Sequence, residues 1–91
     1  MLTPIYKSTF KRDFKRAIRR GKDPERIKSV VRLLCAQEPL PPALRDHALT
    51  GNLAGLRDCH IENDWVLLYY IEQDILVLVL ADTGTHSDLS L

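Results

Sequence analysis

The spacing of apolar residues changes halfway along the chain, and this change limits the possible folds more than any other feature. In the first half, apolar residues recur three and four positions apart, the period of one helical face. They form two stripes, Phe10, Phe14, Ala17 and Ile18, then Ile27, Val30, Val31 and Leu34. Later the apolar residues form runs of strand length, 65–71 and 75–81. The change predicts two helices followed by a sheet.

Capping and turn residues mark the ends of the two predicted helices. Ser8 or Thr9 can cap the first helix through a hydroxyl oxygen. Gly21 can end it, because glycine adopts the left-handed conformation without strain. Asp23 can cap the second helix, and Pro24 suits its first position, where an N–H is not needed. The two helices are expected to form a hairpin.

Two further segments complete the predicted sheet. Residues 2–7 form a short strand, and Pro4 favours a sheet edge because it cannot donate a ladder hydrogen bond. Residues 53–61 form another strand, after a loop at 38–52 that is rich in proline. The order β-α-α-β-β-β predicts a compact α+β domain over 1–91, with the helical hairpin on one face of an antiparallel sheet of about four strands. The other face is free to carry a groove.

Length and cysteine content narrow the class of protein. A chain of 91 residues has room for one hydrophobic core. Its two cysteines show no CxxC spacing, and its amino terminus lacks an apolar run of signal-peptide type. The longest apolar run, 75–81, is far shorter than the roughly 18 residues of a membrane span. We therefore expect a cytoplasmic protein with reduced thiols and no contact with membranes.

The net charge of +1 hides a strong division along the chain. Residues 1–46 carry a net charge of +7 and residues 47–91 carry −6. A clustered basic surface is the electrostatic footprint of nucleic-acid binding. The solvated basic face of an ordinary helix explains the same pattern, so charge alone leaves both interpretations open.

All three histidines, His47, His60 and His86, lie in the acidic half, each expected at a loop or a strand end. His60 shares a predicted strand face with Asp58, and Asp64 follows in the next turn. Three interpretations compete: unrelated solvated histidines, a zinc site completed by Cys59 or Asp64, or general acids and bases. No pair has the spacing that holds zinc ligands on one helical face, so we expect no metal and no cofactor. Imidazole titrates near neutrality and suits acid–base work.

The basic half of the chain directs the acid–base interpretation toward RNA cleavage. RNA carries a 2′-OH beside its phosphodiester, so a base can activate this oxygen and an acid can protonate the departing 5′-oxygen. Each proton transfer contributes on the order of 10²–10⁴-fold. A cation near the phosphorane supplies electrostatic stabilisation. Arg45 and Arg57 flank the histidines and are the local candidates.

The second half of the chain closely resembles one toxin family. The segment "DHALTGNLAGLRDCHIENDW" is followed by an apolar strand pair and by "TGTHSDL". This pattern resembles the YafQ branch of the RelE/ParE superfamily, the toxins of bacterial toxin–antitoxin pairs. The resemblance implies a ribosome-dependent mRNA interferase with the compact fold described above. It also implies a cognate antitoxin, and the 70S ribosome with its mRNA and ribosomal RNA as partners.

The resemblance also implies which residues act. The matching catalytic positions are His47, His60, Asp64 and His86, and Trp65 matches an aromatic residue beside the aspartate. His86 would be nearest to the scissile phosphate. The basic helices would face ribosomal RNA, and the expected RNA-binding residues are Lys11, Arg12, Lys15, Arg16, Arg19, Arg20, Lys22, Arg45, Arg57 and Trp65.

One position departs from the family pattern. Relatives commonly carry an aromatic residue after the leucine of the last motif, whereas this chain has Ser90. The loss of a stacking surface would weaken the grip on an mRNA base by about 1–3 kcal/mol. This departure supports an alternative, a catalytically weakened relative that only binds ribosome, RNA or antitoxin. A plain RNA-binding module is a further alternative.

Overall fold

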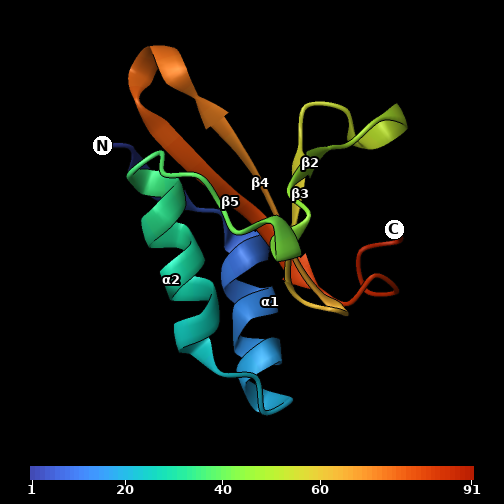
Figure 1. The fold of residues 1–91 in the computed structure, drawn as a ribbon. Helices are drawn as coiled ribbons and strands as arrows, with labels where there is room; N and C mark the ends of the chain where they lie inside the picture. The colour runs from blue at the N-terminus through green and yellow to red at the C-terminus, as the bar shows by residue number, and fades with distance from the viewer.

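The computed structural model describes residues 1–91 as two helices packed on one face of a sheet (Figure 1). The helices form the hairpin that the apolar stripes predict, and the sheet follows them as expected. The elements are β1 (Thr3–Tyr6), α1 (Ser8–Arg19), α2 (Pro24–Cys35), β2 (His47–Ala48), β3 (Arg57–Glu62), β4 (Trp65–Glu72) and β5 (Val77–Gly84). The α+β class is confirmed.

The sheet has five strands and is mixed, rather than antiparallel with about four strands as the sequence predicts. Its order is β1-β5-β4-β3-β2, and β1 runs parallel to β5 at one edge. The helical hairpin returns the chain so that the last strand lies beside the first in the same direction. The predicted loop 38–52 contains β2, a two-residue strand that pairs with β3.

The ends of the helices follow the predicted signals in part. Asp23 caps α2 by accepting a hydrogen bond of 3.0 Å from the Glu25 N–H. Gly21 adopts a left-handed conformation with φ of 88° after α1. The predicted cap of α1 is wrong: its N-cap is Lys7, without a side-chain hydrogen bond. Thr9 instead donates its hydroxyl to the Ala81 carbonyl at 2.7 Å, which fastens α1 to β5.

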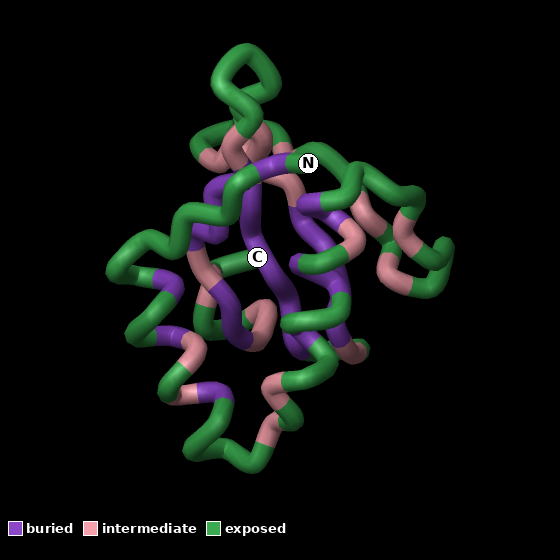
Figure 2. The backbone as a smooth tube through the Cα atoms, turned by 90° about the vertical axis from the view of Figure 1, so that its left-hand side faces the viewer, coloured by how far each residue is buried: buried purple, intermediate pink, exposed green.

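The core lies between the helical hairpin and the sheet, and Figure 2 shows that buried residues follow the strands. Trp65 and Tyr69 are among its largest fully buried side chains. Both predicted stripes contribute to it, with one exception: Ile18 is 43% exposed because it lies at the edge of the stripe. Neither helix has the length and apolar character needed to cross a lipid bilayer.

Candidate active site

Alternation along β3 separates a core-facing side from a polar side. Cys59 and Ile61 belong to the hydrophobic core, so Asp58 and His60 point to the opposite side of the strand. Asp58 is 3% exposed and His60 is 8% exposed. The sheet therefore buries a carboxyl and an imidazole side by side, away from the helices.

The ends of β3 and β5 bring His60 and His86 together. The Nε2 atoms of the two rings are 3.1 Å apart, within hydrogen-bond distance. Behind His86, its Nδ1 lies 2.6 Å from Oδ1 of Asp64. The backbone N–H of His86 donates to the same oxygen at 2.8 Å. Three of the four predicted catalytic residues thus form one hydrogen-bonded array.

Asp64 holds His86 through two hydrogen bonds that also fix its own charge. The backbone N–H and the ring of His86 keep the pKa of the Asp64 carboxyl below its usual range. An ionised carboxylate accepts a hydrogen bond from Nδ1–H, so the neutral His86 carries its proton there and leaves Nε2 as an acceptor. His60 must then donate its Nε2–H across the 3.1 Å contact.

This pattern of protons leaves one contact of the array unsatisfied. Nδ1 of His60 lies 3.2 Å from Oδ1 of Asp58, yet neither buried atom makes a hydrogen bond. Two neutral imidazoles supply two protons for three contacts, so one contact must lack a proton. Burial lowers the pKa of His60, and the opposing charge of Asp58 does not reverse this. A proton on Nδ1 of His60 would complete the contact with Asp58, but burial opposes that protonation.

His47 stands at the periphery of the array. Its Nδ1 lies 2.7 Å from the carbonyl oxygen of Arg45, which fixes the proton on Nδ1 and leaves Nε2 without a hydrogen bond, 4.0 Å from Oδ2 of Asp58. Its ring centroid is 6.3 Å from that of His60, and the His60 and His86 centroids are 5.1 Å apart. The side chains of His47 and His86 are 52% and 39% exposed, whereas that of His60 is 9% exposed. The outer two rings are therefore open to a ligand, and His60 connects them.

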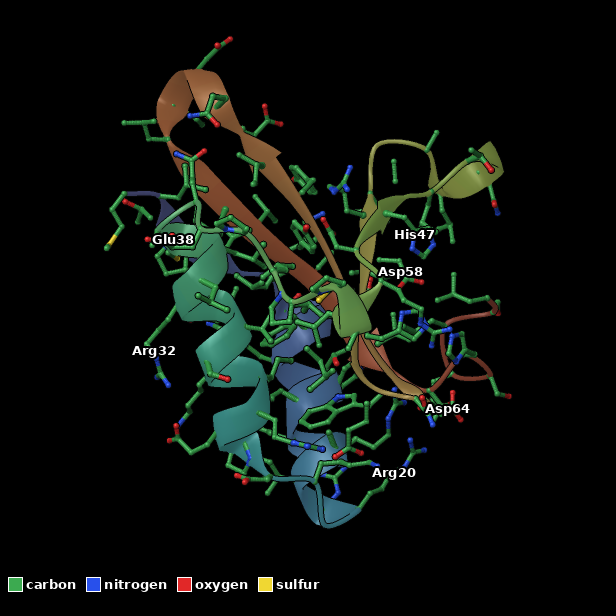
Figure 3. All side chains as sticks on the ribbon, in the orientation of Figure 1. Arg20, Arg32, Glu38, His47, Asp58 and Asp64 are labelled. Atoms are coloured by element: carbon green, nitrogen blue, oxygen red, sulfur yellow. The ribbon has the colours of Figure 1, made fainter.

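The two predicted arginines near the histidines have different surroundings. Arg45 is exposed and lines a cavity of about 600 Å³ together with His60 and Asp64. Arg57 instead binds Asp46, with contacts of 3.3 and 3.0 Å, and the hydroxyl of Tyr69 donates to the same carboxylate. These contacts of the half-buried Arg57 and Asp46 with the buried Tyr69 hold the loop that carries Arg45 and His47, and Figure 3 shows His47 close to Asp58. Arg45 is the cation that remains available to a phosphate.

Trp65 does not lie where the prediction put it. The indole is 1% exposed within the core, and its N–H donates to Oγ1 of Thr83 at 2.9 Å. It has no surface to present to RNA, contrary to the expectation. Its place directly after Asp64 ties the turn that carries Asp64 to the core instead.

The basic residues predicted to bind RNA divide into two groups. Arg12 and Arg16 bind the buried Asp13, Arg20 binds Asp88, and Lys22 binds Glu62. Three others, Lys11, Lys15 and Arg19, are exposed and make no ion pair within the chain. Ser90, at the position where the family pattern leads us to expect an aromatic residue, is exposed with φ of 58°.

Sequence reasoning placed Asp58 on the strand face of His60 without giving it a role, and it missed Asp46 as the partner of Arg57. Asp58 is buried beside His60, and Asp46 is half-buried beside Arg57. The alternation of Asp58 with His60 in "RDCHIE" is a signal for the first, whereas nothing local marks the second. No group of three histidine, cysteine or acidic side chains has a geometry that could hold a metal ion.

Comparison with known proteins places this geometry in one family. A family model described as a bacterial toxin of type II toxin–antitoxin system, YafQ, matches residues 2–91. The mRNA interferase toxin YafQ of Escherichia coli K12 is 38% identical over 85 residues, covering 92% of this chain and 90% of that protein. The crystal structure of YafQ from Escherichia coli BL21(DE3) superposes with a TM-score of 0.90 at 34% identity, over 98% of each chain. YafQ in the Escherichia coli DinJ–YafQ complex gives 0.87 at 36% identity, again over 98% of each chain. The chain belongs to the YafQ family of type II toxins.

Proposed function

We propose that this toxin is a ribosome-dependent mRNA interferase that cleaves RNA by attack of the 2′-OH on the adjacent phosphodiester. The observation that carries the proposal is the array of His60, His86 and Asp64, with Nε2 atoms 3.1 Å apart and a carboxylate 2.6 Å behind. Such an array moves protons near neutral pH and needs no metal ion. The family membership and the name of the relative from Escherichia coli K12 support the same activity.

The exposure of the three rings assigns their roles in this proposal. His47 keeps Nε2 unprotonated, since its Nδ1–H donates to the Arg45 carbonyl, and it is the base that removes the 2′-OH proton. The 2′-oxygen then attacks phosphorus, and the bond to the 5′-oxygen breaks. His86, whose protonated form Asp64 stabilises, is the acid that protonates this leaving oxygen. The products are a 2′,3′-cyclic phosphate and a 5′-hydroxyl.

His60 and Arg45 complete the proposed mechanism. His60 is buried between the two outer rings, so it relays a proton between them and returns each to its starting state. The Arg45 guanidinium stabilises the charge on the phosphorane oxygens, the electrostatic contribution that is usually the largest in such reactions.

The proposed partners follow from a basic surface on α1 and from an adjacent groove, which share Lys11 and Lys15. Lys11, Lys15 and Arg19 on α1 are the residues we assign to ribosomal RNA, through phosphate contacts that weaken as salt increases. Because its target is the translating ribosome, the toxin acts in the cytoplasm.

A groove between the two helices and β1 suits the antitoxin. It has a volume of about 950 Å³, an apolar floor and a basic rim, and is lined among others by Phe10, Phe14, Ile27, Val31, Lys11, Lys15, Lys28 and Arg32. This lining fits an amphipathic helix with acidic flanks. The DinJ–YafQ complex of the relative supports a protein antitoxin as the partner. Lys28→Glu is expected to weaken antitoxin binding, measured by titration calorimetry, with Glu38→Gln outside the groove as the control.

Induced expression in a bacterium tests the function. The 5′ ends of cellular mRNA are mapped against the reading frame for the wild type and for His86→Ala. We expect growth arrest with cuts in a fixed relation to the reading frame, and loss of both in the variant. Folded wild-type protein that leaves growth and mRNA intact would contradict cleavage and favour a toxin relative that only binds.

A further inference from the structure

A single carboxylate fastens the turn that carries His86 to helix α1. Oδ2 of Asp88 lies 2.6 Å from Nη1 of Arg20 and 3.6 Å from Nη2 of Arg16. The same oxygen accepts a hydrogen bond of 3.0 Å from the backbone N–H of Thr85. In return, the Asp88 N–H donates to Oγ1 of Thr85 at 3.0 Å. The residue immediately before His86 is thus joined to α1 through Asp88.

The packing around this carboxylate is tight. A Cβ atom on Gly84 would lie 2.9 Å from both Cβ and Oδ2 of Asp88, and 3.2 Å from Nη2 of Arg16. No side chain fits at position 84 unless the carboxylate and the guanidinium move apart. Arg20 also reaches the second oxygen of Asp88 at 3.4 Å, so the guanidinium engages both oxygens. Bidentate contacts of this kind set direction as well as distance.

The rest of the C-terminal segment offers His86 few other anchors. After β5 ends at Gly84, the backbone–backbone hydrogen bonds stay within the turn itself, from Leu89, Ser90 and Leu91 back to 85–87. The remaining contacts of His86 are those with Asp64 and His60. A segment with so few backbone contacts is mobile unless side chains tie it down. The contact of Asp88 with α1 is one such tie, beside the hydrogen bonds of His86 to Asp64.

We infer that Arg20 and Asp88 are positioning residues for His86, and that Arg20 serves this role rather than contact with RNA. The inference rests on the proposed ribonuclease function, because the Arg20–Asp88 contact would affect cleavage only by positioning His86, the proposed proton donor. It also separates the basic residues of α1 by role. Arg20 is held against Asp88, whereas Lys11, Lys15 and Arg19 remain free for RNA.

Two measurements on Arg20→Met and Asp88→Ala separate positioning from RNA binding. The first is the rate of a single turnover on ribosome-bound mRNA at saturating toxin, and the second is the affinity for the ribosome. Displacing a catalytic group by an ångström costs about 10²-fold in rate. We therefore expect both variants to lower the rate by about that factor, with little change in affinity. The double variant should be no slower than either single one, because both break the same contact.

The control variant is Glu25→Gln on α2, which breaks an exposed ion pair with Arg32 (3.7 Å), and Figure 3 shows Arg32 on the side of α2 away from Arg20 and Asp64. It should leave the rate unchanged. Asp88→Asn keeps an oxygen for the Thr85 N–H and loses only the charge, so it should retain more activity than Asp88→Ala. A normal rate with weakened ribosome affinity in Arg20→Met would overturn the inference and return Arg20 to RNA binding.

A spectroscopic test distinguishes failure of this inference from failure of the proposed function. In NMR spectra of the free toxin, the Nδ1–H signal of His86 reports its hydrogen bond to Asp64. Arg20→Met and Asp88→Ala should both shift or broaden this signal, while the signals of His47 stay unchanged. If the wild type does not cleave mRNA, the proposed function fails but this result still decides the positioning role. An unchanged His86 signal in both variants would refute it.

Discussion

Replacement of Thr83 by valine tests the buried contacts that join the ends of β4 and β5. Thr83 is fully buried, and its Oγ1 donates to the Val66 carbonyl at 2.7 Å while accepting from the Trp65 N–H at 2.9 Å. Valine has nearly the same shape and no oxygen. It leaves a donor and an acceptor unsatisfied where water cannot reach them. Trp65 follows Asp64 directly, so this contact supports the catalytic turn.

The expected magnitude follows from counting these groups. Each buried polar group that loses its partner costs about 1–3 kcal/mol. The extra methyl group of valine offsets roughly 1 kcal/mol through burial of apolar surface. With two such groups, Thr83→Val should therefore reduce the free energy of unfolding by about 1–5 kcal/mol, with a centre at about 3 kcal/mol. Thr83→Ser keeps both hydrogen bonds and loses one methyl group, which costs about 1 kcal/mol.

Urea unfolding of the two variants measures the difference, and thermal unfolding provides a check. For a domain of this size, each 1 kcal/mol corresponds to about 4–8 °C in Tm. Apolar burial alone predicts the opposite order, with valine more stable than serine. A valine variant as stable as the wild type, or more stable than the serine variant, would refute the role of the hydrogen bonds.

Three further predictions concern the site. Because burial lowers the pKa of His60 from its usual 6.5, the unfolded chain binds a proton that the folded protein excludes. The free energy of unfolding should thus fall as the pH drops below about 6.5, less steeply in His60→Gln, and equal slopes in urea titrations would contradict this. A substrate with sulfur in place of the 5′-leaving oxygen needs no acid, so it should restore cleavage by His86→Ala but not by His47→Ala, and rescue of both would disprove the assigned roles. Arg45→Met should lower the single-turnover rate by about 10²-fold without loss of stability, and a normal rate would exclude Arg45 from phosphorane stabilisation.

Local signals in the sequence predict the two helices and the strand at 65–71 well, whereas the strands predicted at 53–61 and 75–81 begin only at Arg57 and Val77, after 3-10 turns. The apolar stripes, Gly21 and the Asp23–Pro24 pair act within a few residues of themselves, so their effects can be read directly. The parallel pairing of β1 with β5 joins residues more than seventy positions apart, and no local pattern encodes it. The predicted cap of α1 is wrong because the Thr9 hydroxyl donates instead to the Ala81 carbonyl on β5.

The candidate site was also only partly predictable from the sequence. The motif pattern identifies His60, Asp64 and His86, and the structure brings them together. The motif pattern does not reveal that Trp65 is buried, because an aromatic residue beside a proposed catalytic one suits either the core or a ligand. Nor does a basic helix show which of its arginines already have a partner: Arg20 meets an acid 68 positions away. Such pairings depend on the tertiary fold.

The most direct test of the proposed mechanism is a single 2′-deoxy substitution in ribosome-bound mRNA, at the nucleotide before the cut. The all-ribose message should be cleaved to a 2′,3′-cyclic phosphate and a 5′-hydroxyl. The deoxy message should bind equally well and remain intact, because it lacks the attacking oxygen. Equal cleavage of both messages, or products carrying a 5′-phosphate, would contradict attack by the 2′-OH.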